Sequence, residues 1–176
     1  MGRKILFATL TAGFLALGGG TAFAAIVGGT PEADDLAGGN APDTLLGGPG
    51  KDSLDGRGGD DLLRRDEGDD TLVDLAGDDV LRGGLGDNTF GGNPGDDELF
   101  GGSGNDVLLD DAGVDEFSGG AGDDVIAVPG FGPEPPGLPL ESDTISCGAG
   151  NDRVIAHKLD LVGGDCEEVD RLGDGG

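Results

Sequence analysis

Acidic side chains recur along this chain at a fixed spacing of nine residues. Aspartate fills nine positions of the grid, and Asn88 fills the gap between Asp79 and Asp97. Carboxylate and amide oxygens suit hard divalent cations, whereas zinc and copper favour histidine and cysteine, and His157 is the only histidine. The spacing therefore predicts a repeated cation site built from oxygen ligands. The grid positions are Asp43, Asp52, Asp61, Asp70, Asp79, Asn88, Asp97, Asp106, Asp115 and Asp124.

The grid belongs to a nine-residue unit, whose positions we number one to nine. Two clear copies read Gly101-Gly102-Ser103-Gly104-Asn105-Asp106-Val107-Leu108-Leu109 and Gly119-Gly120-Ala121-Gly122-Asp123-Asp124-Val125-Ile126-Ala127. Glycines at the first, second and fourth positions permit positive φ, so each unit predicts a tight turn followed by a very short strand. The apolar eighth position is buried only if units stack. Its residues are Leu36, Leu45, Leu54, Leu63, Leu72, Leu81, Phe90, Leu99, Leu108, Phe117, Ile126, Ile145 and Val154.

The unit matches the pattern G-G-x-G-x-D-x-U-x, in which U is apolar. On these residues the chain resembles the haemolysin-type (repeats-in-toxin, RTX) calcium-binding family. The register is unbroken from Gly29 to Ala127. Two more units, 138–146 and 147–155, follow a ten-residue insertion, so Asp143 and Asp152 extend the grid only if the insertion leaves the coil undisturbed.

The resemblance implies an all-β fold, a right-handed parallel β-roll in which two units make one turn. Strands then pair with those eighteen residues away, about 4.8 Å apart. The unpaired edges of the terminal rungs need caps at both ends.

The resemblance also implies that calcium binds between stacked turns, held by the grid carboxylates and by carbonyls of the glycine-rich stretch. Calcium accepts six to eight oxygens in loose geometry, whereas magnesium demands a tight octahedron. One face would hold Asp34, Asp52, Asp70, Asn88, Asp106 and Asp124, and the other Asp43, Asp61, Asp79, Asp97 and Asp115. This arrangement permits five plus four sites, the best of them between turns 101–106 and 119–124.

Some units depart from the pattern. Arg65-Asp66, Asp74-Leu75 and Asp110-Asp111 stand where two glycines are expected, so nine ions is an upper limit. Asn88 keeps an oxygen ligand but loses charge, which predicts weaker sites. The acids at the fifth position resemble paired catalytic carboxylates, but they recur with the repeat, so we interpret them as a solvated acidic face.

Composition narrows the functional classes. The formal net charge of -26 excludes nucleic acid as a partner. Forty glycines, no Trp and no Tyr leave little bulky apolar surface for an ordinary core, so a metal-free chain should be largely disordered. A solenoid that needs no metal is the alternative.

Residues 1–24 are predicted to be a secretory signal peptide. Arg3 and Lys4 precede an apolar run, and Ala22-Phe23-Ala24 supplies a cleavage signature. The run from Ile5 to Leu17 is shorter than the roughly 20 residues that span a bilayer, which argues against a membrane anchor. We expect a lead-in and degenerate first repeat at 25–37, the β-roll at 38–155 with a Pro-rich insertion at 128–137, and a cap and tail at 156–176.

Cys147 and Cys166 are the only cysteines, and an even pair in an exported chain predicts one disulfide. With eighteen residues per turn, as the resemblance implies, the two lie on neighbouring rungs and staple the cap. The insertion is too rich in proline to pair in a sheet. It is either a recognition loop carrying Phe131 or a tolerated surface loop.

These features favour a secreted, non-enzymatic, monomeric calcium-binding protein that folds on export, when it meets millimolar calcium. The alternative is a calcium-rigidified envelope or matrix protein that presents residues 128–137 to a cell-surface or polysaccharide partner. A third hypothesis, a module that modifies polysaccharides, has no recognisable reaction centre to support it.

Overall fold

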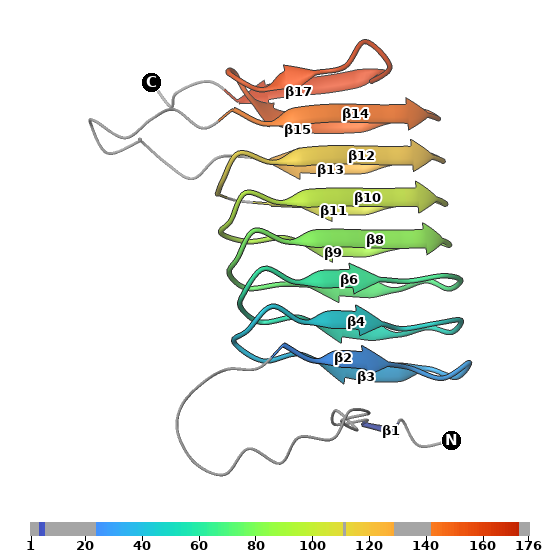
Figure 1. Ribbon diagram of the computed structural model, residues 1–176. Coiled ribbons are helices and arrows are strands. Elements are labelled where there is room, and N and C mark those ends of the chain that lie inside the picture. The colour runs from blue at the N-terminus through green and yellow to red at the C-terminus, as the bar shows by residue number, and fades with distance from the viewer. Residues whose placement is uncertain (1–3, 6–23, 111, 129–141, 173–176) are drawn as a thin grey trace.

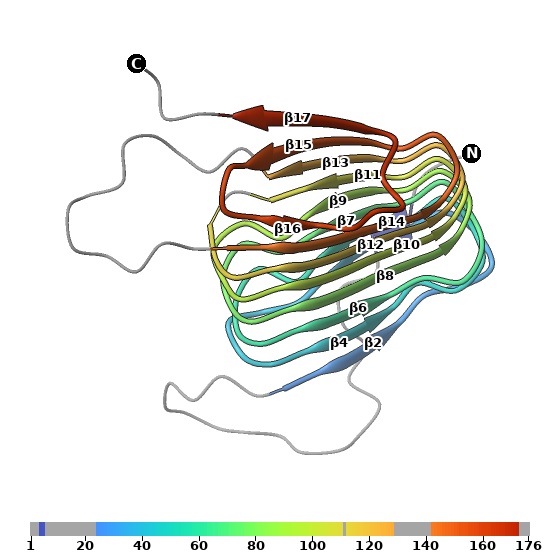
Figure 2. The ribbon, with the colours of Figure 1, turned by 90° about the horizontal axis from the view of Figure 1, so that it is seen from above.

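The computed structural model describes residues 4–5, 24–110, 112–128 and 142–172, and all of its regular structure there is strand. Successive strands alternate between two parallel sheets, so that each turn of the coil adds one strand to each sheet. Figure 1 shows these turns stacked as layers from β2 and β3 to β17, and Figure 2 shows the two sheets facing each other. The predicted parallel β-roll is confirmed.

The odd-numbered strands form the nine-stranded sheet: β1 (Lys4–Ile5), β3 (Asp34–Ala37), β5 (Ser53–Asp55), β7 (Thr71–Val73), β9 (Thr89–Gly91), β11 (Val107–Leu109), β13 (Val125–Val128), β15 (Arg153–His157) and β17 (Glu168–Leu172). The even-numbered strands form the eight-stranded sheet: β2 (Ile26–Gly28), β4 (Thr44–Leu46), β6 (Leu62–Arg64), β8 (Val80–Leu85), β10 (Glu98–Ser103), β12 (Glu116–Ala121), β14 (Thr144–Ala149) and β16 (Leu161–Val162).

The register follows the eighteen-residue turn. Leu99 of β10 pairs with Phe117 of β12, and Leu108 of β11 pairs with Ile126 of β13. Across the insertion Phe117 pairs with Ile145, twenty-eight residues away, because the ten inserted residues are left out of the stack. The predicted register of Asp143 and Asp152 is therefore preserved.

The core is a single apolar column between the sheets. All thirteen residues predicted at the eighth position are buried, and most of them have no more than 1% of their surface exposed. Fully burying a Leu or Phe side chain stabilises a fold by about 1.5–3 kcal/mol. Stacking supplies this burial because a single short strand has no second layer of its own to cover it.

The glycines serve two different purposes. Gly102 and Gly104, at the second and fourth positions, have φ of 114° and 125°, which side chains with a β-carbon rarely adopt. Gly101 and the other first-position glycines do not adopt positive φ, so that expectation is wrong for the first position. Glycine is present there for space, because a β-carbon on Gly101 would lie 2.5 Å from Oδ2 of Asp106.

Several expectations concern residues outside the described part of the chain. Of the predicted signal peptide, Lys4–Ile5 form β1, which pairs with β3, and Ala24 is also described. The signal peptide and the domain boundaries remain predictions. Phe131 and all of the insertion after Val128 lie outside the described residues.

A candidate calcium-binding ladder of carboxylates

The predicted site residues lie in two columns, one along each sheet. The odd column contains Asp34, Asp52, Asp70, Asn88, Asp106, Asp124 and Asp152, and the even column contains Asp43, Asp61, Asp79, Asp97, Asp115 and Asp143. We call the space between two successive members of a column an interval.

One oxygen of each grid side chain is held by the preceding rung. The backbone N–H of Asp106 donates to Oδ1 of Asp124 (2.8 Å), and that of Asp61 donates to Oδ1 of Asp79 (2.6 Å). The pattern continues across the insertion, where the N–H of Asp124 donates to Oδ1 of Asp152 (2.8 Å). Because the backbone fixes one oxygen, the direction of the other is also fixed.

The second carboxylate oxygen is buried and accepts no hydrogen bond at seven grid positions. A buried carboxylate oxygen without a donor or cation is costly. These oxygens line the intervals, where a cation would restore their lost solvation. They are Oδ2 of Asp61, Asp70, Asp79, Asp97, Asp106, Asp124 and Asp152.

The electrostatics of the columns favour a cation. Burial, followed by the neighbouring carboxylates Asp79 and Asp115, raises the pKa of Asp97 to about 7. Burial likewise raises the pKa of Asp106 and that of Asp124 to about 6, with the next carboxylate in the column adding to each shift. These groups resist ionisation because burial removes the water that would solvate their charge and the neighbouring carboxylates repel it.

Backbone carbonyls complete the site between turns 101–106 and 119–124. The space beside Gly101 is bordered by Oδ2 of Asp106 and by the carbonyl oxygen of Gly119. The ligands are therefore oxygens only, drawn from carboxylates and carbonyls, in a space that a β-carbon would fill. This set fits calcium, which accepts many oxygens in irregular geometry.

Asn88 changes the intervals that it borders. Its Oδ1 accepts the N–H of Asp70 (3.1 Å), as an aspartate oxygen would. Its Nδ2 takes the place of the second oxygen and donates to Oδ1 of Asp106 (3.0 Å) and to the carbonyl of Gly86 (2.9 Å). The interval between Asn88 and Asp106 therefore has one anionic ligand fewer.

Arg65 fills an interval of the odd column. At the first position of its unit it has no exposed side-chain surface, and it extends into the space beside Gly47. Its Nη1 donates to Oδ2 of Asp52, and its Nη2 lies 3.7 Å from Oδ1 of Asp70. Burial lowers the pKa of Arg65, while Asp70 and Asp52 oppose that shift. The guanidinium of Arg65 thus lies between two grid carboxylates and gives this interval the positive charge that the intervals described above lack.

Asp74 and Asp110 add carboxylates to the even column at the same first position. Asp74 lies with Asp61 and Asp79, and a ligand oxygen from each is within 4.8 Å of those of the other two. Burial, followed by the charge of Asp79, raises the pKa of Asp74 to about 8. Asp110 forms an equivalent group with Asp97 and Asp115.

Two members of the ladders were not predicted from the sequence. Oδ1 of Asp160 accepts the N–H of Asp143 (3.2 Å), and Oε2 of Glu167 accepts the N–H of Asp152 (2.9 Å). The nine-residue spacing fails here because these rungs are shorter by one and three residues. An acid two places before Val162 and Val169 was the signal that could have identified them.

The acids at the fifth position are exposed and form separate ladders in the opposite direction. Oδ1 of Asp78 accepts the N–H of Asp96 (3.1 Å), and Oδ1 of Asp96 accepts the N–H of Val114 (3.0 Å). They align the turns at the surface of the rod and do not line the intervals.

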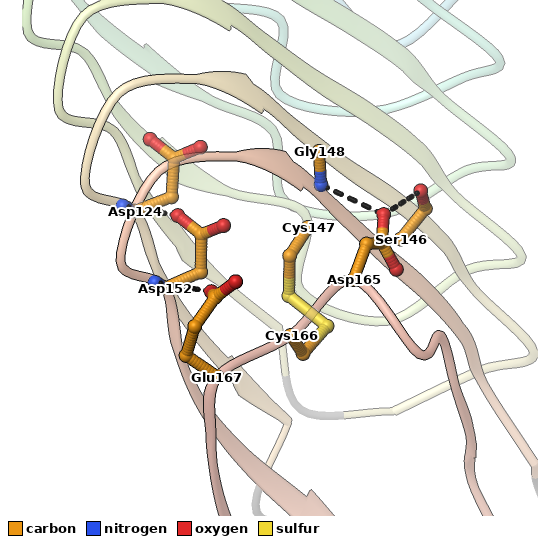
Figure 3. Close-up of a disulfide and its surroundings, with 8 residues drawn as sticks. All are labelled: Asp124, Ser146, Cys147, Gly148, Asp152, Asp165, Cys166 and Glu167. Atoms are coloured by element: carbon orange, nitrogen blue, oxygen red, sulfur yellow. Dashed lines mark hydrogen bonds between the residues drawn. A yellow bond between two sulfur atoms is a disulfide. The ribbon is translucent and has the colours of Figure 1, made fainter.

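The disulfide between Cys147 and Cys166 is present, as predicted, and joins the last full rungs to the segment that precedes β17. Cys147 occupies the first position of its unit and is fully buried. Figure 3 shows Asp165 beside the disulfide, where it accepts the N–H of Gly148 (2.9 Å) and the hydroxyl of Ser146 (3.0 Å). These hydrogen bonds, the one from Gly148 above all, lower the pKa of Asp165.

A parallel β-roll with columns of buried carboxylates between its rungs defines a cation-binding solenoid. The chain belongs to the RTX calcium-binding nonapeptide repeat family, whose four-copy model matches residues 28–63, 66–99 and 91–126. This family binds calcium through its repeats and is typically structural. No curated protein matches the chain. Within the described residues, no helix has the length and apolar character needed to cross a bilayer.

Proposed function

We propose that this protein is a secreted, non-enzymatic calcium-binding rod that takes up calcium between its rungs and folds as it does so. The observation that carries the proposal is the column of buried carboxylate oxygens that accept no hydrogen bond, exemplified by Oδ2 of Asp106 and Asp124. A doubly charged cation in each interval would balance these charges and replace the water they have lost.

The residues that line an interval have different roles in binding the ion. The N–H of the preceding rung orients each carboxylate through Oδ1 and leaves Oδ2 for the ion. The carbonyl of Gly119 and its equivalents add neutral ligands, and the missing β-carbon of Gly101 leaves room for the ion. An ion held by these oxygens would contact both rungs, so its binding would join neighbouring turns.

Coupling between binding and folding follows from the charge. The chain carries a formal charge of -26, and two grid carboxylates about 5 Å apart repel by roughly 3 kcal/mol at an effective dielectric constant near 20. Calcium removes this repulsion, and its binding free energy becomes folding free energy because the unfolded chain has no preformed site. Of nine intervals in the unbroken array, Arg65 fills one, which leaves up to eight for calcium.

Secretion rests on the predicted signal peptide and on calcium availability. Extracellular modules bind calcium with dissociation constants of roughly 10⁻⁴–10⁻³ M, which matches millimolar calcium outside cells. The absence of enzymatic activity rests on the repeated character of the acids. Every buried grid carboxylate has an equivalent one turn away, and Asp74 and Asp110 form two equivalent groups, whereas a reaction centre is unique.

A calcium titration of residues 25–176 in chelator-treated buffer, followed by far-UV circular dichroism, tests the proposal. We expect a cooperative change from coil to β-structure with calcium and none with equal magnesium. Unchanged spectra would refute metal-driven folding. A spectrum already rich in β-structure would then indicate a metal-independent solenoid, and a coil spectrum a disordered acidic chain.

A further inference from the structure

Asp74 enters an interval that is otherwise built like its neighbours. It replaces the first-position glycine of its unit, and its carboxylate occupies the space that glycine leaves open at Gly56. A β-carbon on Gly56 would overlap Oδ2 of Asp74 and would lie 2.6 Å from Oδ2 of Asp61. The side chain of Asp74 therefore depends on a glycine one rung away and projects into the interval between Asp61 and Asp79.

All three carboxylates of this interval are anchored through one oxygen. Oδ1 of Asp74 accepts the N–H of Leu75 (2.7 Å), Oδ1 of Asp61 accepts the N–H of Asp43 (2.6 Å), and Oδ1 of Asp79 accepts the N–H of Asp61 (2.6 Å). The three Oδ2 atoms are buried and accept no hydrogen bond.

Asp74 is fully buried, and Asp61 and Asp79 are at most 3% exposed. Three buried carboxyl groups held this close by the backbone cannot move apart, so only a cation would allow all three to ionise together.

The interval between Asp97 and Asp115 repeats this arrangement. Asp110 projects into the space beside Gly92, where a β-carbon would overlap Oδ2 of Asp110 and lie 2.6 Å from Oδ2 of Asp97. Oδ2 of Asp97 is buried and accepts no hydrogen bond, and ligand oxygens of the three acids lie within 4.8 Å of one another.

The standard interval between turns 101–106 and 119–124 has only two carboxylates, because both of its first positions are glycine. Ligand charge is one of the two properties that tune calcium affinity over many orders of magnitude, and rigidity is the other. The intervals that contain Asp74 and Asp110 exceed the standard interval in charge and equal it in backbone anchoring.

We propose that Asp74 and Asp110 create two three-carboxylate cation sites, distinct from the standard repeat sites, which bind calcium more tightly and prefer trivalent lanthanide ions over calcium. The two sites lie in the even column, separated by the single interval between Asp79 and Asp97. They fill first as calcium rises. The inference rests on the proposed function, since it compares these sites with standard intervals that bind calcium.

Isothermal titration of calcium into the full protein tests the inference, with Asp74→Gly, Asp110→Gly and the double variant measured beside it. Each substitution restores the residue usual at that position. The matched control is Asp78→Asn, which removes the same charge from an exposed acid of the same unit and keeps an oxygen for the N–H of Asp96.

We expect two ions to bind roughly tenfold or more tightly than the others. Each single variant should lose one of these two ions from the tight class, and the double variant should lose both while the weaker class remains. Asp78→Asn should keep both tight ions. Europium(III), excited directly because the chain has no Trp or Tyr, should displace calcium first from the two tight sites and show a separate excitation band that the double variant lacks.

A single affinity class in the unaltered protein, or two tight ions persisting in the double variant, would overturn the inference while leaving the proposed function intact. Loss of the tight class in Asp78→Asn would also overturn it, because overall charge would then explain the effect. No calcium bound in any class would refute the proposed function itself.

Discussion

Replacing Arg65 with glycine should convert a metal-independent interval into a calcium site. In the present protein the guanidinium lies between the buried carboxylates of Asp52 and Asp70, with its Nη2 3.7 Å from Oδ1 of Asp70. At that distance and an effective dielectric constant near 20, one such attraction is worth about 4 kcal/mol. Part of it offsets the cost of burying the arginine, and removing one partner of a buried pair typically destabilises a protein by about 3–5 kcal/mol.

The variant should recover this stability as calcium rises. A site that binds only the folded state contributes about 4.1 kcal/mol when the ion concentration is about 1,000 times its dissociation constant. Arg65→Gly should therefore be about 3–5 kcal/mol less stable at low calcium and should approach the unaltered protein about three decades above the dissociation constant of the new site.

Denaturant unfolding at a series of fixed calcium concentrations measures this effect. The free energy of unfolding should rise with the logarithm of calcium concentration more steeply in Arg65→Gly, by about 1.4 kcal/mol per decade, which corresponds to one additional ion released on unfolding. Arg64→Gly is the matched control, because Arg64 is exposed on β6, and it should cost about 1 kcal/mol without a change in slope. Equal slopes for Arg65→Gly and the unaltered protein would refute the conclusion that Arg65 occupies an ion position.

Three further predictions concern the titration of Asp97, the open space beside Gly101 and the disulfide of the C-terminal cap. Burial raises the pKa of Asp97 to about 7 from 3.8, so between about pH 4 and pH 7 the metal-free folded state keeps a proton that the unfolded chain releases. The stability of the metal-free folded state should therefore fall as pH rises through that window. Lowering the pH from 8 to 5 without calcium should raise the β-content seen by far-UV circular dichroism, and an unchanged spectrum would contradict this. Gly101→Ala places a methyl group against Asp106 and should remove an ion from the count obtained by calorimetry, whereas Gly164→Ala, with nothing within 4 Å, should not. Reducing the disulfide between Cys147 and Cys166, which are nineteen positions apart, should lower the stability by about 3 kcal/mol. Thermal unfolding at saturating calcium measures this, and an unchanged midpoint would mean that the disulfide does not stabilise the cap.

The strict period made the stack predictable. The apolar eighth position follows from the spacing, and the eighteen-residue register follows from the resemblance to the RTX repeat, because every rung repeats the same contacts. The continuation of both columns through Asp143 and Asp152 depended on an undisturbed coil after the insertion, which the structure shows. Local exceptions were harder to predict.

Arg65 and Asp74 break the glycine pattern, and the sequence alone indicates damage to a site. The structure instead directs one side chain into an interval as a cation and the other as a third carboxylate. A side chain at the first position can enter an interval only where the glycine one rung away leaves space for it. This contact joins residues eighteen positions apart, as Asp74 and Gly56 are.

The ladders also give the rod a direction. In both columns the N–H of a grid residue donates to the carboxylate of the following rung. Among the described residues the even column ends at Asp160 and the odd column at Glu167. Removing a rung from the carboxyl end therefore leaves a grid N–H without its carboxylate acceptor, whereas removing one from the amino end leaves a grid carboxylate without its N–H donor. Equal truncations at the two ends therefore remove different partners of the same inter-rung hydrogen bond. In the grid columns each rung takes this contact from its successor, so the disulfide-linked end of the rod supplies the final acceptors, Asp160 and Glu167.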